Sequence, residues 1–321
     1  MPLFRRGSDE EREARQAAEE EQTASVASLE RGGLPVRAQE RLGQIGKAGG
    51  GLFTSDLSVA EFALLRAIGL RPVAQVMGSS IYHVGWQQRP GAWGMQLGGV
   101  SQELTVVSEA WNTARLRAFG RLEQEAKLVG ADAVVGVRLQ IGRHDWAVGA
   151  IEYVAVGTAV RIDGAAQPDR PVLTDLSGQD FWKLWQAGQR PLGVVGASTV
   201  HYVVASWQTQ RAQSGFAASW VNQELKDFTL GVYDARETAL GRMSAEAQQQ
   251  GAAGVVGVSI VHTAEEREAG GGSGRRDLVV TFHVLGTAIG PVGSERRELQ
   301  VSPRLDLSRD RQRPHILGGN R

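Results

Sequence analysis

The sequence predicts an α+β protein built from two tandem copies of one unit, each an antiparallel sheet packed on one long helix. The stretch "AKLVGADAVVGVRL", residues 126–139, returns as "AQQQGAAGVVGVSI", residues 247–260, which is 121 positions later. The segment "LSVAEFALLRAIGLRPV" from Leu57 likewise aligns with "LSGQDFWKLWQAGQRPL" from Leu176. Over residues 114–137 the two copies are identical at 13 of 24 positions without a gap. Such self-similarity indicates an internal duplication.

Each copy begins with a predicted short helix. Ser58 with Glu61, and Ser177 with Asp180, have the spacing of a capping box, in which the hydroxyl accepts a free helix N–H. Each helix is followed by a glycine, suited to the left-handed position after a helix, and then by Arg-Pro; these glycines are Gly69 and Gly188. We therefore expect two helices with defined ends.

The next segment of each copy is predicted to be a β-hairpin. In copy one, "RPVAQVMG" is followed by "SSIYHVGW", and in copy two "RPLGVVGA" is followed by "STVHYVVASW". Both segments contain β-branched and aromatic residues on either side of a central glycine, which is the pattern of two strands joined by a turn. The predicted order of each unit is therefore β-β-α-β-β.

A long helix follows, with apolar residues repeating at i+3 and i+4. In copy one the stripe consists of Leu104, Val107, Trp111, Ala114, Ala118, Leu122 and Ala126, and adding 121 gives an apolar residue at every position of copy two. A helix over residues 102–129 spans about 42 Å at 1.5 Å per residue. One short sheet cannot cover that length, so we expect the excess stripe to meet the sister domain, another subunit or a docked tail. The small residues Ala118 and Ala239 would admit such a neighbour.

Two strands close each unit. Gly130 and Gly251 end the long helices, and the valine-rich phrase that follows is predicted to be a buried strand in each copy. The second strands are "AIEYVAVGTAVRI" and "LVVTFHVLGTAI". Within the first strands, Gly136 and Gly257 are expected to let a neighbouring backbone approach closely.

These elements divide the chain into four parts. Residues 1–50 form a charged segment predicted to be disordered, with a docking helix as an alternative for 34–42. Domain 1 covers 51–164 and domain 2 covers 175–291, each an antiparallel sheet of about four strands on one long helix with a short preceding helix. Residues 292–321 form an Arg-rich tail, also predicted to be disordered.

Composition excludes several classes of function. The 35 basic and 35 acidic residues cancel, so no global field attracts nucleic acid or an anionic membrane. The chain has no cysteine, which excludes disulfides and thiolate metal sites. The N-terminus becomes charged within five residues, and no apolar run approaches the length of a membrane span. We expect a cytoplasmic protein.

The duplicated unit resembles a known family. Ala114-Arg115, the small residues that follow on the helix, "GADAVVGVRL" and the closing "VAVGTAV" are similar to the YbjQ-like family, which is described as heavy-metal-binding. The match is fainter in copy two, where Asp132 is replaced by Ala253. The resemblance implies an antiparallel sheet with one helix and packing into ring-shaped pentamers, and it implies no known reaction.

The sequence itself gives little support for catalysis or metal binding. The six histidines are scattered and no pair has the i, i+4 spacing of a helical metal site. No nucleophile elbow, phosphate loop or dinucleotide fingerprint is present. We predict no enzymatic activity, no cofactor and no bound metal.

Five residues are candidates for a ligand or an interface. Arg115 and Arg236 occupy equivalent positions on the long helices, where each would bind an anion or form a salt bridge. Asp132 is either a ligand or a turn residue between helix and strand. Trp182 and Trp185 lie on the short helix of copy two and are candidates for a partner-facing patch, with core packing as the alternative.

The sequence thus favours a non-enzymatic, ring-forming scaffold or interaction protein, with five chains and stacked rings of like domains as the expected assembly. Its predicted partners are further copies of itself and another protein at the tryptophans, but not nucleic acid or a membrane. The alternative is a module that binds a metal ion or a small anion between subunits.

Overall fold

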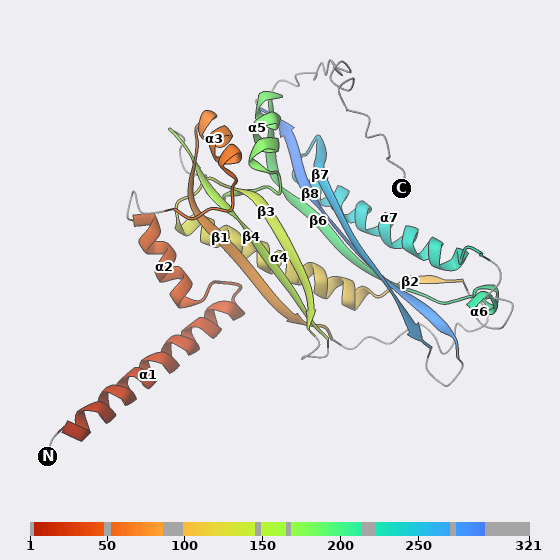
Figure 1. The fold of residues 1–321 in the computed structure, drawn as a ribbon, viewed down its shortest axis with the longest axis horizontal. Helices are drawn as coiled ribbons and strands as arrows, with labels where there is room; N and C mark the ends of the chain where they lie inside the picture. Colours follow the sequence, from red (N-terminus) through yellow and green to blue (C-terminus); the bar gives the residue numbers. More distant parts are fainter. Residues whose placement is uncertain are drawn as a thin grey trace, which may run out of the picture.

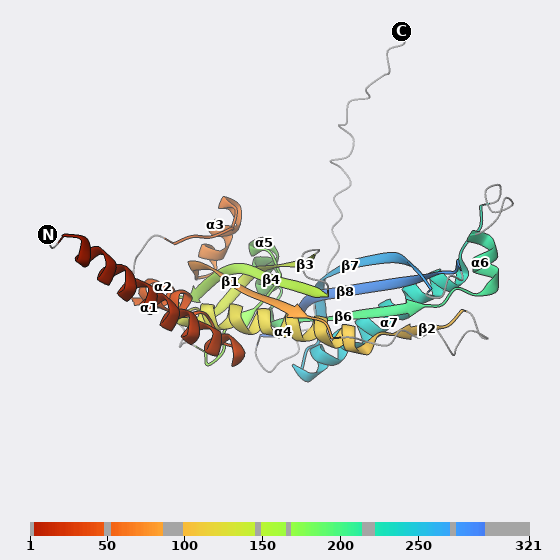
Figure 2. The ribbon, with the colours of Figure 1, turned by 90° about the horizontal axis from the view of Figure 1, so that it is seen from below.

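The computed structural model describes residues 3–47, 53–85, 99–144, 149–164, 168–213, 222–269 and 274–292. Two twisted four-stranded sheets stand side by side (Figure 1), and Figure 2 shows a long helix under each sheet, both on the same side. This arrangement confirms the predicted α+β class and the tandem duplication. No helix in the described ranges is long and apolar enough to cross a bilayer. The tail from residue 293, predicted to be disordered, lies outside these ranges.

Each domain has one short helix, one long strand, one long helix and two further long strands. In domain 1 these are α3 (Val59–Ala67), β1 (Leu70–His83), α4 (Thr105–Leu128), β3 (Ala133–His144) and β4 (Ala150–Ile162). In domain 2 they are α5 (Gly178–Gln186), β6 (Gln189–Val203), α7 (Lys226–Gln249), β7 (Gly254–Glu268) and β8 (Arg276–Pro291). A further helix, α6 (Trp207–Gln213), follows β6.

The predicted hairpins are wrong, because each of those segments is one continuous strand. β1 has 14 residues and β6 has 15, and both pass straight through the glycine that was expected to form a turn. A side chain at Gly78 would collide with the backbone of α4 at Ala118 and Leu122. The glycine is therefore needed for close packing of strand on helix, and each domain supplies three long strands instead of four.

The fourth strand of each sheet crosses the domain boundary. The sheet orders are β1-β4-β3-β5 and β2-β6-β8-β7. Strand β2 (Ser101–Glu103) lies just before α4 of domain 1 but pairs with β6 of domain 2. Strand β5 (Val172–Leu173) leads into domain 2 but pairs, in parallel, with β3 of domain 1. The two domains are thus joined by an exchange of short strands.

The predicted helix ends are confirmed. Ser58 and Glu61 form a complete capping box at α3, and the Ser177 hydroxyl accepts the Asp180 N–H at α5. The glycines after the helices take positive φ, including Gly130 at 71° and Gly251 at 69°. These local signals were readable because each depends on residues at most four apart.

The apolar stripes of the long helices are buried against their own sheets. Ala118 and Ala239 are fully buried in the domain cores. Their small size admits the strands of the same domain, as the contact of Ala118 with Gly78 shows. The expectation that these alanines admit another subunit is therefore wrong, and a large side chain at either would disrupt a domain core. The excess length of α4 meets the sister domain, one of the three neighbours that the sequence predicts, and the N-terminal helix α2.

The N-terminal segment is helical where the sequence predicts disorder. It forms α1 (Leu3–Glu30) and α2 (Val36–Lys47). α1 is rich in alanine, glutamate and arginine, all good helix formers. Leu34 and Leu42 are buried with Ala126 and Val129 at the end of α4, which confirms the alternative prediction of a docking helix near 34–42.

Gly136 and Gly257 have a different role from the one predicted. A side chain at Gly136 would meet nothing within 4 Å, so close approach does not explain this residue. Both glycines have positive φ, 64° and 68°, at the bulges of β3 and β7. The requirement is conformational, since few other residues adopt this backbone geometry.

Candidate interaction surfaces and the interdomain site

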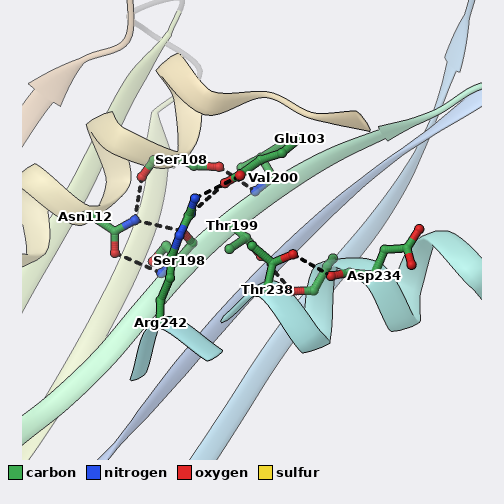
Figure 3. Close-up of polar contacts among 10 residues, drawn as sticks. Glu103, Ser108, Asn112, Ser198, Thr199, Val200, Asp234, Thr238 and Arg242 are labelled. Carbon is green, nitrogen blue, oxygen red and sulfur yellow. Dashed lines mark hydrogen bonds and ion pairs between the residues drawn. The ribbon is translucent and has the colours of Figure 1, made fainter. Parts of the chain in front are cut away.

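The first half of α4 lies along the outer edge of β6 and satisfies its backbone groups with side chains (Figure 3). The Asn112 amide donates to the Ser198 carbonyl at 2.8 Å and accepts the Ser198 N–H at 3.0 Å. The Ser108 hydroxyl accepts the Val200 N–H at 2.9 Å. An exposed strand edge would otherwise be a template for association. Domain 1 therefore protects the edge of domain 2.

Strand β2 continues this protection toward the end of β6. Gln102 pairs with Tyr202 in antiparallel register, and the pairs on either side follow the same register. At the last residue of the strand, both Glu103 oxygens accept from the Arg242 guanidinium, at 2.6 and 2.9 Å (Figure 3). A bidentate pair of this kind fixes geometry as well as charge.

A second ion pair joins the domains at the middle of α4. The Arg115 Nη2 donates to Glu246 of α7 at 3.1 Å, and the Arg115 side chain is only 6% exposed. The same Glu246 oxygen accepts the Gly196 N–H of β6 at 3.1 Å. Arg115, predicted as a candidate for an anion or an interface, is thus placed between the two domains.

The opposite side of the domain junction is formed by β5 and the residues after it. Thr174 donates its N–H to the Val134 carbonyl at 2.9 Å, and its hydroxyl lies 3.0 Å from the Thr287 hydroxyl of β8. The Leu176 carbonyl accepts the Gly136 N–H at 2.9 Å. The segment that begins domain 2 is thus hydrogen-bonded to the bulge of β3.

An open-sided cavity of about 310 Å³ lies at this junction. Its wall includes Arg115, and among the described residues the Nε and Nη1 atoms of this buried side chain have no hydrogen-bond partner. Tyr153 and Ser198, whose oxygens are 2.6 Å apart, also line it, and the Ser198 oxygen is 2.8 Å from His283 Nδ1. Burial raises the pKa of Tyr153 to about 12, so the phenol stays protonated and able to donate.

Arg236, the counterpart of Arg115, faces solvent. Its side chain is 45% exposed and its only ion pair in the described part of the chain is with the neighbouring Glu237, at 3.8 Å. Leu230 and Tyr233 on the same helix are also exposed. The face of α7 that corresponds to the interdomain face of α4 therefore lacks a sister domain.

Asp132 has a structural role in domain 1. Its carboxylate accepts the Ile162 N–H at 2.6 Å and is buried where α4 passes into β3. In domain 2, the residue at the position of Ile162 is Pro291, because Leu70 pairs with Ile162 and Gln189 pairs with Pro291. Proline has no N–H to donate, which explains why Ala253 replaces the aspartate.

The predicted tryptophan patch lies on α5. Trp185 is 43% exposed and Trp182 is half-buried. No described contact brings either ring to the interdomain cavity, so the patch is separate from Arg115. Trp182 and Trp185 remain candidates for a partner on that helix.

The described histidines do not converge. Across the described ranges, no three side chains of the metal-binding types form a group that could hold an ion. His201 is buried, with Nδ1 3.1 Å from the Ser101 hydroxyl, whereas His83 is exposed. Burial lowers the pKa of His201, so the imidazole beside β2 favours its neutral form.

Sequence reasoning missed the partners of the arginines. Glu246 and its counterpart Glu125 were visible as shared identities, but nothing in one sequence says that Glu246 meets Arg115. Asn112 and Ser108 were missed because polar residues on a helix surface are usually solvated. Their signal is spacing, since residues four apart lie on one helix face.

Comparison with known proteins decides the family. The YbjQ family model, described as "Putative heavy-metal-binding", matches residues 92–163 and 189–290. The chain belongs to the YbjQ family. The two matched regions correspond to its two tandem copies.

Among relatives, an encapsulin nanocompartment protein of Mycobacterium tuberculosis is 40% identical over 265 residues, which is 80% of this chain and 91% of that protein. A UPF0145 protein of Natronomonas pharaonis is 45% identical over 60 residues, 19% of this chain and 56% of that protein. One of Archaeoglobus fulgidus is 43% identical over 63 residues, 20% of this chain and 56% of that protein. The chain thus matches just over half the length of these two shorter YbjQ-family relatives. No solved structure matches the chain.

Proposed function

We propose that this chain is a non-enzymatic, homo-oligomeric scaffold protein of the cytoplasm that assembles into a closed ring. The mycobacterial relative, which covers most of the chain, is named as a nanocompartment protein, and we propose the same setting here.

The observation that carries this proposal is the outer edge of β7. This strand has 15 residues and, within the described ranges, pairs on one side only, with β8. Val258, Ile260 and Val261 are exposed along it. A long edge strand with apolar residues and free backbone groups is an association site unless something covers it. In domain 1 the equivalent strand, β3, is covered at its start by β5, so a similar cover for β7 is expected from another chain.

The test is the mass of the wild-type protein by light scattering at tens of micromolar. The expected result is a defined multiple of the 34.5 kDa chain, and five chains is the number implied by the family resemblance. The Val258→Lys variant should reduce the mass, because a lysine on a strand edge opposes pairing. The matched Val258→Thr variant keeps the branched side chain and should retain the mass. A wild-type chain that remains monomeric would contradict the proposal.

A second candidate function, binding of a small anion between the domains, is favoured by Arg115. Two nitrogens of its buried guanidinium have no hydrogen-bond partner among the described residues, the side chain lines an open-sided cavity, and Tyr153 supplies a hydroxyl in the same wall. A guanidinium with unused donors suits a phosphate or carboxylate group. The metal ion that was the other part of this alternative has no comparable support among the described residues.

The anion is tested by thermal unfolding with inorganic phosphate against sodium chloride of equal ionic strength. Binding to the folded state raises the melting temperature as the phosphate concentration exceeds the dissociation constant. The rise should disappear in Arg115→Lys, which lacks the fork, and zinc should give no rise. An unchanged melting temperature at 10 mM phosphate (roughly ten times a millimolar dissociation constant) would remove this candidate.

A further inference from the structure

The contact between the two domains has a direction. Domain 1 contributes the start of its long helix and the segment before it, and domain 2 contributes the outer edge of its first strand. We call the first of these the front surface of a domain and the second its back surface. Because the domains are copies, each has a front and a back surface. The internal contact uses the front of domain 1 and the back of domain 2. The front surface of domain 2 comprises residues 222–224 and the α7 face with Thr229, Tyr233 and Arg236. The back surface of domain 1 comprises residues 77–84 of the β1 edge with Arg121 and Glu125.

We propose that the front surface of domain 2 binds the back surface of domain 1 in a second copy of this chain, repeating the interdomain contact between molecules. This inference rests on the proposed homo-oligomeric function and names the surfaces that build it. It accounts for the exposure of Tyr233 and Arg236 on α7, and of Met77 and Ile81 on β1.

The ion pair between Arg115 and Glu246 has an equivalent residue for each partner on the two free surfaces. Arg115 corresponds to Arg236, and Glu246 corresponds to Glu125. Glu125 accepts the Met77 N–H at 2.8 Å, just as Glu246 accepts the Gly196 N–H. Burial raises the pKa of Glu125, and a guanidinium placed beside it would favour its charged form. Arg236 of a second copy supplies that charge.

The second ion pair is also preserved. Glu103 and Arg242 of the internal contact correspond to Glu224 and Arg121. Glu224 is exposed in the chain. Arg121 donates to the Ser79 carbonyl of β1. It also donates to two carbonyls at the end of α1 and in the turn after it, those of Leu29 and Gly33. This turn therefore holds the guanidinium that Glu224 of a second copy binds. Docking exchanges the two carbonyls for a carboxylate, which is the stronger acceptor for a cation.

At Ile81 the backbone edge of β1 offers the same groups that the edge of β6 offers at Val200, whereas the Ser79 carbonyl already accepts from Arg121. Val200, whose N–H donates to Ser108 and whose carbonyl accepts the Leu104 N–H, corresponds to Ile81. The partners of Ile81 in a second copy are Thr229, which keeps the hydroxyl, and Leu225, which has the same backbone angles as Leu104. Tyr233 takes the place of Asn112 and brings a hydroxyl instead of an amide.

The other side of the internal contact repeats in the same way. The Ser55 hydroxyl lies 3.0 Å from that of Thr158, as Thr174 lies against Thr287. The segment that precedes domain 2 also adds a strand, β5, to β3 of domain 1. The segment from residue 53 is therefore positioned to add a strand to the start of β7 in a second copy, beside the bulge at Gly257.

Repetition of one directional contact gives a closed ring or a filament. Every ring of whole chains then alternates domain 1 and domain 2 around its circumference. This arrangement replaces the stacked rings of like domains that the sequence suggested, because the interdomain contact joins unlike domains side by side (Figure 1).

Disulfide trapping tests the proposal, since the chain has no cysteine of its own. Ser101 pairs with Val203 in the internal contact, and the equivalent pair between copies is Asn222 with Val84. Directly opposed residues in antiparallel strands are close enough for a disulfide. Mild oxidation of Asn222→Cys/Val84→Cys should give a ladder of covalent multiples on a non-reducing gel. The matched control, Ser101→Cys/Val203→Cys, should cross-link within the chain and give only the mass of one chain.

Mixing the two single variants tests direction. Asn222→Cys with Val84→Cys should give covalent dimers and nothing larger, and neither variant alone should cross-link. Dimers of one single variant alone, or an oligomer of wild-type mass without any cross-link, would overturn the proposed surfaces and leave the scaffold function standing. A monomeric wild-type chain would end both. Asn222 is exposed and Val84 is half-buried at the margin of a core, so light scattering of each variant before oxidation verifies that it still assembles.

Discussion

Replacing Arg115 by alanine is expected to lower the free energy of unfolding by about 3 kcal/mol, since removal of one partner leaves a half-buried charge unpaired. Glu246 would keep its bond from the Gly196 N–H but lose the guanidinium that joins it to domain 1. The Glu246 side chain is 27% exposed, so water reduces the loss below that of a fully buried pair. Urea unfolding followed by tryptophan fluorescence measures the change.

Arg236 provides the matched control for Arg115. It occupies the same position on α7 but is exposed, and exposed ion pairs contribute up to about 1 kcal/mol. In dilute solution, where chains are separate, Arg236→Ala should change the free energy of unfolding by less than about 0.5 kcal/mol. At assembling concentrations the same variant should reduce the mass. Equal stability losses for Arg115 and Arg236 would contradict the assigned difference between the two arginines.

Replacing Gly78 by alanine is the second large expected effect. The added methyl group would meet backbone atoms of Ala118 and Leu122, and backbone cannot move aside as a flexible side chain can. Overpacking of a tight core typically costs 1–3 kcal/mol, and we expect about 3 kcal/mol here because both clashing atoms are main chain. The measurement is again the free energy of unfolding, with near-ultraviolet circular dichroism to report the packing of Trp111 in the same core.

Gly120, on α4, is the control for this substitution. A methyl group there meets nothing within 4 Å, and alanine is preferred over glycine in a helix by about 1 kcal/mol. Gly120→Ala should therefore leave the domain unchanged or stabilise it. If Gly78→Ala were equally tolerated, β1 and α4 would not be packed as closely as described.

Local signals in the sequence were sufficient to predict where the short helices begin and end. The capping box of Ser58 and Glu61 and the glycines at 69 and 188 depend only on neighbours along the chain, and all are found as predicted. The hairpins failed for the opposite reason. Gly78 is required because it packs against the backbone of a helix some 40 residues away in sequence. The residues around a glycine do not show whether it is needed for such packing or for a turn.

The interdomain site was predictable only in part. Arg115 and Arg236 are a repeated pair, but no pattern of residues distinguishes the buried arginine from the exposed one. Their difference arises because Arg115 of domain 1 contacts Glu246 of domain 2, whereas the described ion pair of Arg236 is with its own neighbour Glu237. The structural role of Asp132 could be distinguished from a ligand-binding role only from the strand register, which shows that Ile162 and Pro291 are equivalent.

The helicity of the N-terminal segment was missed because composition alone was weighed. Its charged, aromatic-poor sequence resembles a disordered chain, yet Leu34 and Leu42 dock the end of this segment on α4. Two leucines buried against the end of α4 stabilise this segment despite its low mean hydropathy. The turn between α1 and α2 then lies where the proposed second copy would bind Arg121.

The most direct measurement is a cryo-electron microscopy map of the wild-type assembly at a resolution that shows side chains. The account predicts domains that alternate around the ring, with Arg236 of one chain beside Glu125 of the next and the segment before α7 paired with the edge of β1. A map in which domain 1 meets domain 1, or in which the edge of β1 faces solvent in a closed assembly, would contradict it.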